Sequence, residues 1–118
     1  MHELSICQSL LSQVTTLAVR HQAQQVTGIT VRLGPLGGVV PELLTQAFSI
    51  AALGTVAEQA ELIIETLPVR IHCQQCNFEG EVEPNHLVCP ACSNWRTQLL
   101  SGDEMLLASV ELVTTDSV

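Results

Sequence analysis

The stretch from His72 to Arg96 reads HCQQCNFEGEVEPNHLVCPACSNWR and contains two Cys-x-x-Cys pairs, Cys73/Cys76 and Cys89/Cys92. Each pair can turn two thiolates onto one ion, and a hairpin formed by the residues between the pairs would bring them together. Large apolar residues are few in this stretch, so it cannot form a hydrophobic core of its own. We therefore predict a small lobe that is stabilised by a metal ion bound to all four thiolates.

Four thiolates in a tetrahedron suit Zn²⁺, and a closed set of four ligands leaves no open position for a substrate. A structural zinc ion is therefore expected, with a binding free energy of about 10–16 kcal/mol as in zinc-finger peptides. A rubredoxin-like iron site shares the paired pattern and is the main alternative. Two disulfides would need an oxidising compartment, and a thioredoxin-like centre uses one pair at a helix start. His72 and His86 are expected to be hydrogen-bonded neighbours of the site rather than ligands.

Regular elements are predicted on both sides of the cysteine stretch. Apolar residues recur at helical spacing over residues 3–21. A second helix is predicted over residues 41–54, with a proline in its first turn and a glycine at its end. Alternating apolar residues predict strands over Val26–Leu33, Leu62–Ile71 and Met105–Val113. The last strand is expected to turn four side chains inward: Leu106, Ala108, Val110 and Leu112.

Two helices packed on one face of a three-stranded sheet would bury all of these apolar faces, so the predicted fold class is α+β. Pro68 lies inside the second predicted strand and indicates a bulge or a sheet edge there. The cysteine stretch then becomes an inserted, zinc-ribbon-like lobe. The predicted organisation is an α/β domain of residues 1–71 plus 97–118 and a zinc-binding lobe of residues 72–96.

The charge balance excludes several classes of function. The chain has 118 residues, with 12 acidic residues against four arginines and no lysine, and a formal charge of −8. Such a chain lacks the basic surface that nucleic acids and anionic membranes require. Without lysine it has no Walker A loop and no lysine nucleophile, and we expect it not to be an enzyme.

The expected location is the cytoplasm. The chain has no stretch of about 20 mostly apolar residues that could span a membrane. It also lacks the basic segment that begins a signal peptide. The five cysteines are then expected to be metal ligands or free thiols.

The first residues, Met1-His2-Glu3, form a second candidate metal site. The α-amine of Met1, the imidazole of His2 and intervening backbone amide nitrogens can surround one ion in a plane. A planar, nitrogen-rich set favours Ni(II) or Cu(II) over tetrahedral zinc. Glu3 adds a carboxylate or a second backbone nitrogen. Cys7 could supply a soft axial ligand, but its place on the apolar helix face favours a role in the core.

With both candidate sites placed, the chain resembles the HypA/HybF family of nickel metallochaperones, which mature nickel–iron hydrogenase and sometimes serve urease. The resemblance rests on the opening Met1-His2-Glu3-Leu4-Ser5, Leu33-Gly34, Gly54-Thr55, the two cysteine pairs, Gly102-Asp103-Glu104 and Ser109-Val110-Glu111. It implies that His2 binds nickel and that Glu3 supports this site. It also implies partnership with the HypB GTPase and delivery of nickel to the hydrogenase large subunit.

The expected function is therefore that of a nickel carrier. Ni(II) would be held at the exposed N-terminus, apart from the permanent Zn(II), and would leave by ligand exchange. One alternative is a zinc-ribbon adaptor for protein interactions, in which His2 is incidental. Another is an electron-transfer protein with iron bound to the four cysteines.

Overall fold

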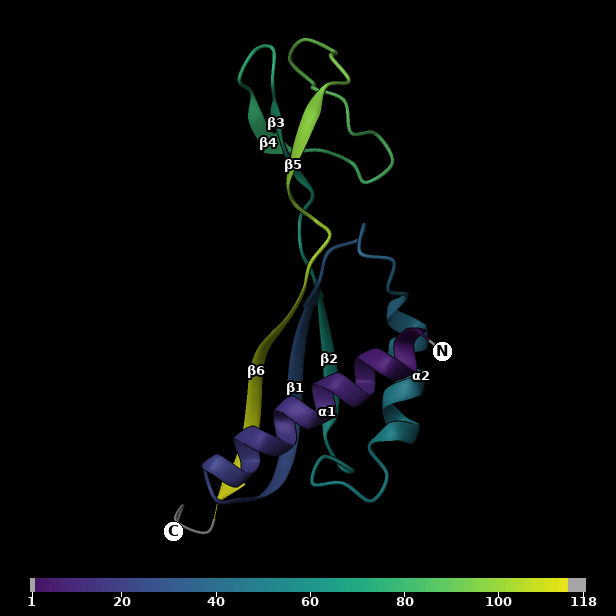
Figure 1. Ribbon diagram of the computed structural model, residues 1–118, viewed down its shortest axis with the longest axis vertical. Coiled ribbons are helices and arrows are strands. Elements are labelled where there is room, and N and C mark those ends of the chain that lie inside the picture. Colours follow the sequence, from purple (N-terminus) through teal and green to yellow (C-terminus); the bar gives the residue numbers. More distant parts are fainter. Residues whose placement is uncertain (1, 115–118) are drawn as a thin grey trace. The chain divides into compact units, whose positions relative to one another are not determined.

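The computed structural model describes residues 2–114, without the side chain of His2. The described chain divides into two compact units. The second unit consists of Arg32–Gly38 and Glu65–Leu106, and all other described residues belong to the first unit. The elements in chain order are α1 (His2–Arg20), β1 (Ala23–Leu33), α2 (Pro41–Ala51), β2 (Glu61–Thr66), β3 (Arg70–Cys73), β4 (Glu79–Glu81), β5 (Thr97–Ser101) and β6 (Met105–Thr114) (Figure 1). No helix in residues 2–114 is long and apolar enough to cross a membrane.

The larger sheet has the order β2-β1-β6, so β1 is its central strand. The Thr27 hydroxyl in β1 donates a hydrogen bond to the carbonyl of Glu111 in β6, and the N–H of Gly34, just after β1, donates to the carbonyl of Glu104, just before β6. These two strands are therefore antiparallel. The N–H of Leu67, just after β2, donates to the carbonyl of Leu33 at the end of β1, over 2.8 Å. Strands β1 and β2 therefore run in the same direction, with α2 as the connection between them.

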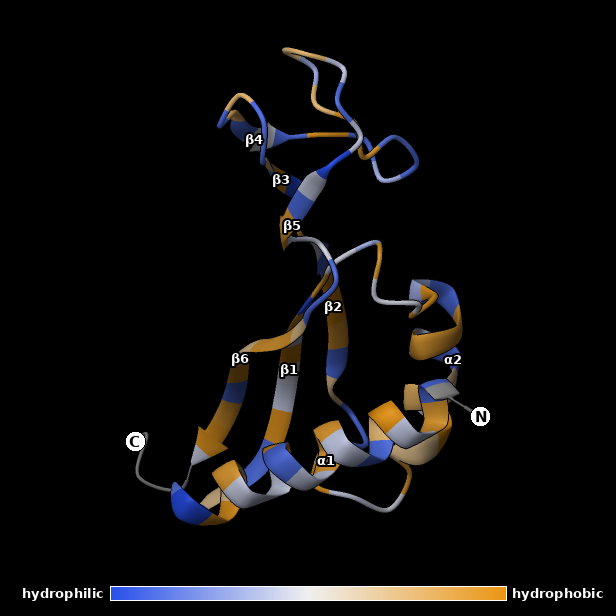
Figure 2. Cartoon of the chain, turned by 45° about the horizontal axis from the view of Figure 1, so that its top comes forward, coloured by the Kyte–Doolittle hydropathy of each residue, from blue (hydrophilic) through white to orange (hydrophobic). Residues whose placement is uncertain are grey.

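Helix α1 forms because its apolar residues share one face. It crosses in front of the three strands in Figure 1, and Figure 2 shows apolar and polar residues alternating along it. Five side chains of that face are buried: Cys7, Leu10, Leu11, Val14 and Ala18. Glu3 in the first turn and Arg20 in the last turn have the charges that the helix dipole favours at those ends. The predicted helix over residues 3–21 is thus confirmed.

Helix α2 begins at Pro41, as predicted, and packs against α1. Leu44 and Phe48 are buried on its inner side. The helix ends at Ala51, before Gly54, which adopts a left-handed backbone conformation at φ +77° in the turns that follow. Two helices on a three-stranded sheet, joined to a small cysteine lobe, match the predicted fold class.

The second unit contains a smaller antiparallel sheet with the order β4-β3-β5. Val69 and Ile71 are buried there together with two of the cysteines, Cys73 and Cys89. Within this unit the backbone of residue 34 lies so close to Gly102 that a Cβ at residue 34 would be 2.1 Å from the Gly102 carbonyl. Only glycine fits at this position.

The single strand predicted over residues 62–71 is wrong. Strand β2 ends at Thr66, and the chain resumes as β3 at Arg70 in the other sheet. Pro68 lies in the break and has no N–H to donate to a strand partner, while its carbonyl accepts a hydrogen bond from the Ser101 hydroxyl. The proline therefore marks a change of sheet instead of a bulge or an edge.

The expected facing of β6 is wrong for its first half. Leu106 is 48% exposed and Ala108 is also exposed, whereas Val110 and Leu112 are half-buried as predicted. Two successive exposed residues, Ala108 and Ser109, interrupt the alternation of the strand. Before this point the odd-numbered residues of β6 are the less exposed ones, and after it the even-numbered residues are.

Candidate metal sites

Each cysteine pair lies in a tight backbone loop, and the two loops repeat one hydrogen-bond pattern. The N–H of Asn77 donates to the carbonyl of Cys73 over 3.0 Å, and the N–H of Ser93 donates to the carbonyl of Cys89 over 2.8 Å. Asn77 and Ser93 both have φ of +63°, in the left-handed region. Each of them directly follows a Cys-x-x-Cys pair. This shared position after each pair is the sequence signal that marks their left-handed conformation.

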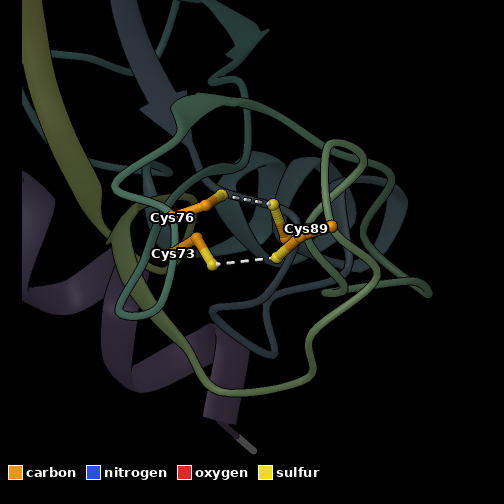
Figure 3. A group of neighbouring side chains, drawn as sticks. Cys73, Cys76 and Cys89 are labelled. Atoms are coloured by element: carbon orange, nitrogen blue, oxygen red, sulfur yellow. Dashed lines mark hydrogen bonds between the residues drawn. The ribbon is translucent and has the colours of Figure 1, made fainter.

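The two loops bring the four predicted thiols together, and Figure 3 labels three of them, Cys73, Cys76 and Cys89. The Sγ atoms of Cys73 and Cys92 are 3.6 Å apart, those of Cys76 and Cys89 are 3.5 Å apart, and all four atoms lie within 4.8 Å of one another. A tetrahedral zinc ion with Zn–S bonds of about 2.3 Å needs S–S separations of about 3.8 Å. All four cysteines are free thiols. The donor set and its spacing therefore fit a tetrahedral divalent metal ion.

The thiols of this cluster have unequal proton affinities. Hydrogen bonds from the backbone N–H groups of Cys76 and Gln75 lower the pKa of Cys73 to about 6. The backbone N–H of Asn94 lowers the pKa of Cys92, but desolvation and the neighbouring cysteines outweigh it and raise this pKa to about 12. The pKa of Cys76 is also raised: the backbone N–H of Phe78 lowers it, but the neighbouring Cys89 and desolvation outweigh that effect. The cluster thus readily holds a first negative charge and resists further ones until a cation supplies the opposite charge.

The two histidines near the cluster lie outside the group of four ligands. The ring Nδ1 of His72 is 2.9 Å from a carboxylate oxygen of Glu79, so this histidine is a hydrogen-bonded neighbour, as predicted. The backbone N–H of His86 donates to the carbonyl of Glu83. Among the described residues, the only group of at least three histidine, cysteine or acidic side chains close enough to share an ion is the cysteine cluster.

At the other candidate site, the first described residue, His2, begins α1. Its imidazole and the whole of Met1 lie outside the described residues. Glu3 is half-buried and lines a hollow of about 360 Å³ between the start of α1 and α2. The first N–H groups of any α-helix have no acceptor within that helix, so the amide nitrogens of the first turn of α1 are not required for its hydrogen bonds.

Cys7 lies one helical turn after Glu3 but belongs to the core. Its side chain is buried, and its Sγ is 3.5 Å from the carbonyl oxygen of Leu44 on α2. Burial and the negative charge of Glu3 raise the pKa of this thiol. Cys7 therefore stays protonated at neutral pH and is not placed to act as a metal ligand.

Comparisons with known proteins agree with this arrangement. The family model described as "Hydrogenase/urease nickel incorporation, metallochaperone, hypA" matches residues 1–112. The hydrogenase maturation factor HypA of Nitrosospira multiformis is 43% identical over 98% of this chain and 100% of its own, and that of Aquifex aeolicus is 46% identical over 95% and 97%. A solution structure of a HypA protein matches 96% of this chain and 97% of its own, with a TM-score of 0.73 and 26% identity. The Helicobacter pylori nickel metallochaperone HypA shares the fold, with a TM-score of 0.70 and 24% identity over 95% and 97%.

Proposed function

Because the chain belongs to the HypA family of nickel-incorporation metallochaperones, we propose that it binds Ni(II) at its N-terminus and delivers the ion during maturation of nickel–iron hydrogenase. His2 and Glu3 are the proposed site residues. The observation that carries this assignment is the position of His2 as the first residue of α1. The first backbone N–H groups of the helix, which have no acceptor within it, therefore belong to the residues at the proposed site.

A planar Ni(II) site needs several nitrogen donors around one ion. The imidazole of His2 supplies one, and amide nitrogens of the first helical turn supply others after losing their protons. Loss of these protons breaks no hydrogen bond within the helix. The negative charge that results lies at a helix N-terminus, where the helix dipole favours it. Glu3 contributes either its backbone nitrogen or its carboxylate.

The second part of the proposal assigns the ion of the cysteine cluster as zinc with a structural role. Cys73, Cys76, Cys89 and Cys92 would all be ligands, which leaves no position open for exchange. Zinc would hold the two loops together, and nickel would bind and leave elsewhere. The protein is thus a carrier and not an enzyme.

The partners proposed on the basis of family membership are the HypB GTPase and the hydrogenase large subunit. The chain has no lysine and no phosphate-binding loop, so any nucleotide hydrolysis would belong to a partner. We place the carrier in the cytoplasm, where a reducing environment keeps thiols available for metal binding.

The test is calorimetric titration of Ni(II) into the wild-type protein and three variants. His2→Ala should abolish tight nickel binding, because it removes the imidazole. His21→Ala is the matched control, since His21 is an exposed histidine just beyond the other end of α1, and it should bind nickel like the wild type. Equal nickel affinity in His2→Ala would overturn the proposed site.

Glu3→Gln distinguishes the two possible roles of Glu3, since it keeps the backbone nitrogen and removes the carboxylate charge. A smaller loss of affinity than in His2→Ala would indicate the backbone nitrogen, and an equal loss would indicate the carboxylate. Metal analysis of the same samples should find one zinc per chain in all four proteins. A red, iron-containing protein would contradict the zinc assignment.

A protein-interaction role of the cysteine lobe is a second candidate function, and one observation favours it. The Trp95 side chain is 73% exposed, and the Arg96 guanidinium lies 5.3 Å from the centre of its ring. Tryptophan and arginine are enriched among the residues that dominate binding at protein interfaces. Trp95→Ala should weaken binding of HypB or of the large subunit without altering nickel or zinc content. Unchanged binding of both partners would exclude this role.

A further inference from the structure

Helix α2 and its two ends carry apolar residues on a second side, away from the side that faces the core. Leu44 and Phe48 are buried at 0% and 4% exposure. Four other large aliphatic side chains are exposed, by 43%, 47%, 69% and 63% respectively: Val40, Leu43, Ile50 and Leu53. We call these four residues the α2 stripe. Leu43 and Ile50 are seven residues, about two turns, apart in α2 and therefore share one side of the helix, while Val40 directly precedes the helix and Leu53 follows its C-cap Ala52.

The α2 stripe continues into a hollow next to the proposed nickel site. Leu43 and Ile50 line this hollow of about 360 Å³ together with Glu3, Leu4 and Gln46. An apolar helix face beside a lined hollow is the geometry that accepts the apolar side of another helix. Any group bound there would contact Glu3 directly.

The charges around the α2 stripe select the kind of partner. Glu3 lines the hollow, and Glu42 is exposed in the first turn of α2. Among the described residues of the first unit, the only lysine or arginine is Arg20, in the last turn of α1 and thus at the opposite end of that helix from Glu3. The surroundings of the stripe are therefore acidic, and they complement a partner surface that carries lysine or arginine.

We propose that the α2 stripe and its hollow dock an amphipathic helix of a partner protein whose apolar face is bordered by lysine or arginine. This inference rests on the proposed function, because docking there would bring the partner next to His2 and Glu3, where nickel is to be transferred. A second copy of this chain is disfavoured as the occupant. Pairing two α2 stripes about a twofold axis would place the acidic surroundings of each copy against the other, and each chain carries a formal charge of −8.

The test uses a fluorescent synthetic peptide of about 14 residues, roughly four helical turns. It carries leucine along one face and lysine along both borders of that face. Fluorescence anisotropy measures its binding to the wild type and to Leu53→Gln and Ile50→Gln. Val19→Gln is the matched control, because Val19 is 73% exposed on α1 in the same unit.

We expect each α2-stripe variant to weaken binding of the lysine peptide about tenfold or more, which corresponds to about 1.4 kcal/mol. Val19→Gln should bind it like the wild type, and a peptide with glutamate in place of lysine should not bind. Equal binding by Leu53→Gln, Ile50→Gln and Val19→Gln would overturn the docking surface. Equal binding of both peptides would overturn the charge selection. A wild-type dimer in sedimentation that Leu53→Gln dissociates would assign the stripe to a second copy instead.

Nickel titration of Leu53→Gln separates the two proposals. Because Leu53 does not line the hollow, this variant should keep wild-type nickel affinity although its affinity for the peptide falls. If His2→Ala retains nickel but the peptide results are as expected, the nickel site is wrong and the docking surface stands. If His2→Ala loses nickel binding but the α2-stripe variants bind the peptide like the wild type, the nickel site stands and the docking surface is wrong.

Discussion

Cys73 and Cys92 belong to one thiol cluster, yet their proton affinities differ widely, with pKa values of about 6 and about 12. At neutral pH Cys73 is therefore mainly a thiolate, and Cys92 is a neutral thiol. The pKa of Cys76 is raised as well, so Cys76 is also protonated at neutral pH. A metal ion that needs thiolates must displace these protons.

This difference predicts the pH dependence of metal binding at the cluster. At pH 7, binding of Zn(II) should release protons from at least Cys76 and Cys92. Because protons compete for raised thiols, the affinity should rise with pH and fall as the solution becomes more acidic. Calorimetry in two buffers of different ionisation enthalpy counts the protons released. Heats of binding that do not depend on the buffer would contradict the prediction.

Ser93 offers a test of backbone strain at single-residue level. A left-handed conformation costs a residue other than glycine about 1–2 kcal/mol, and Ser93 has φ of +63°. Ser93→Gly should therefore raise the unfolding free energy of the metal-loaded protein by about 1 kcal/mol. Ser93→Ala is the control, since it removes the hydroxyl and keeps the Cβ. Chemical denaturation measures both variants, and equal stabilities would show that the strain is not significant.

The elements that were predicted correctly from the sequence are those with a single, strong periodicity. One apolar face identified α1, and Pro41 located the start of α2. The strand predicted over residues 62–71 failed because an unbroken apolar pattern does not reveal which sheet each part joins. The facing of β6 failed because Leu106 and Leu107 are both apolar and fit either phase of the strand.

The candidate sites were predictable to different degrees. The spacing of the four cysteines was sufficient to predict the thiol cluster, because a Cys-x-x-Cys loop places both thiols on one side of a local turn. The left-handed backbone of Asn77 and Ser93 was missed, because neither residue type requires it. His2 and Glu3 remain predictions, since the ring of His2 lies outside the described residues.

The two sides of α2 should contribute very differently to stability. Phe48 is 4% exposed on the inner side, and Phe48→Ala should lower the unfolding free energy by about 3–5 kcal/mol through loss of burial and creation of a cavity. Ile50 is 69% exposed on the same helix, and Ile50→Ala should change it by less than about 0.5 kcal/mol. Thermal or denaturant unfolding followed by circular dichroism compares them. Similar losses in both variants would mean that α2 does not pack as described.

At the scale of the whole molecule, the two compact units depend on different sources of stability. The first unit buries a continuous set of apolar side chains from two helices and a sheet. The second has only a few buried apolar residues beside its cysteine cluster. Metal binding should therefore decide the folding of the second unit and leave the first nearly unaffected. The division into a domain and an independent lobe of residues 72–96 stays a prediction.

Cys73→Ser tests this difference between the units. The variant should lose zinc, and the amides of β3 and β5 should lose protection from hydrogen exchange. The amides of α1 and β1 within residues 10–31 should keep their protection, because their core lies in the first unit. Exchange measured by mass spectrometry, with zinc-loaded wild type as reference, resolves the two regions. Retention of zinc would contradict the four-cysteine site, and unfolding of both regions would contradict separate stability.

The segments of the first unit are not contiguous, since residues 65–106 of the second unit come before Leu107, where the first unit resumes within β6. This order has a consequence for biosynthesis. The ribosome releases β6 after the cysteine lobe, so the central strand β1 cannot acquire this neighbour until the lobe has been translated. The lobe is therefore synthesised, and its cysteines become available to bind metal, before β6 completes the larger sheet. A truncated chain that ends at residue 101 would contain all four cysteines of the cluster and would lack strand β6 of the larger sheet.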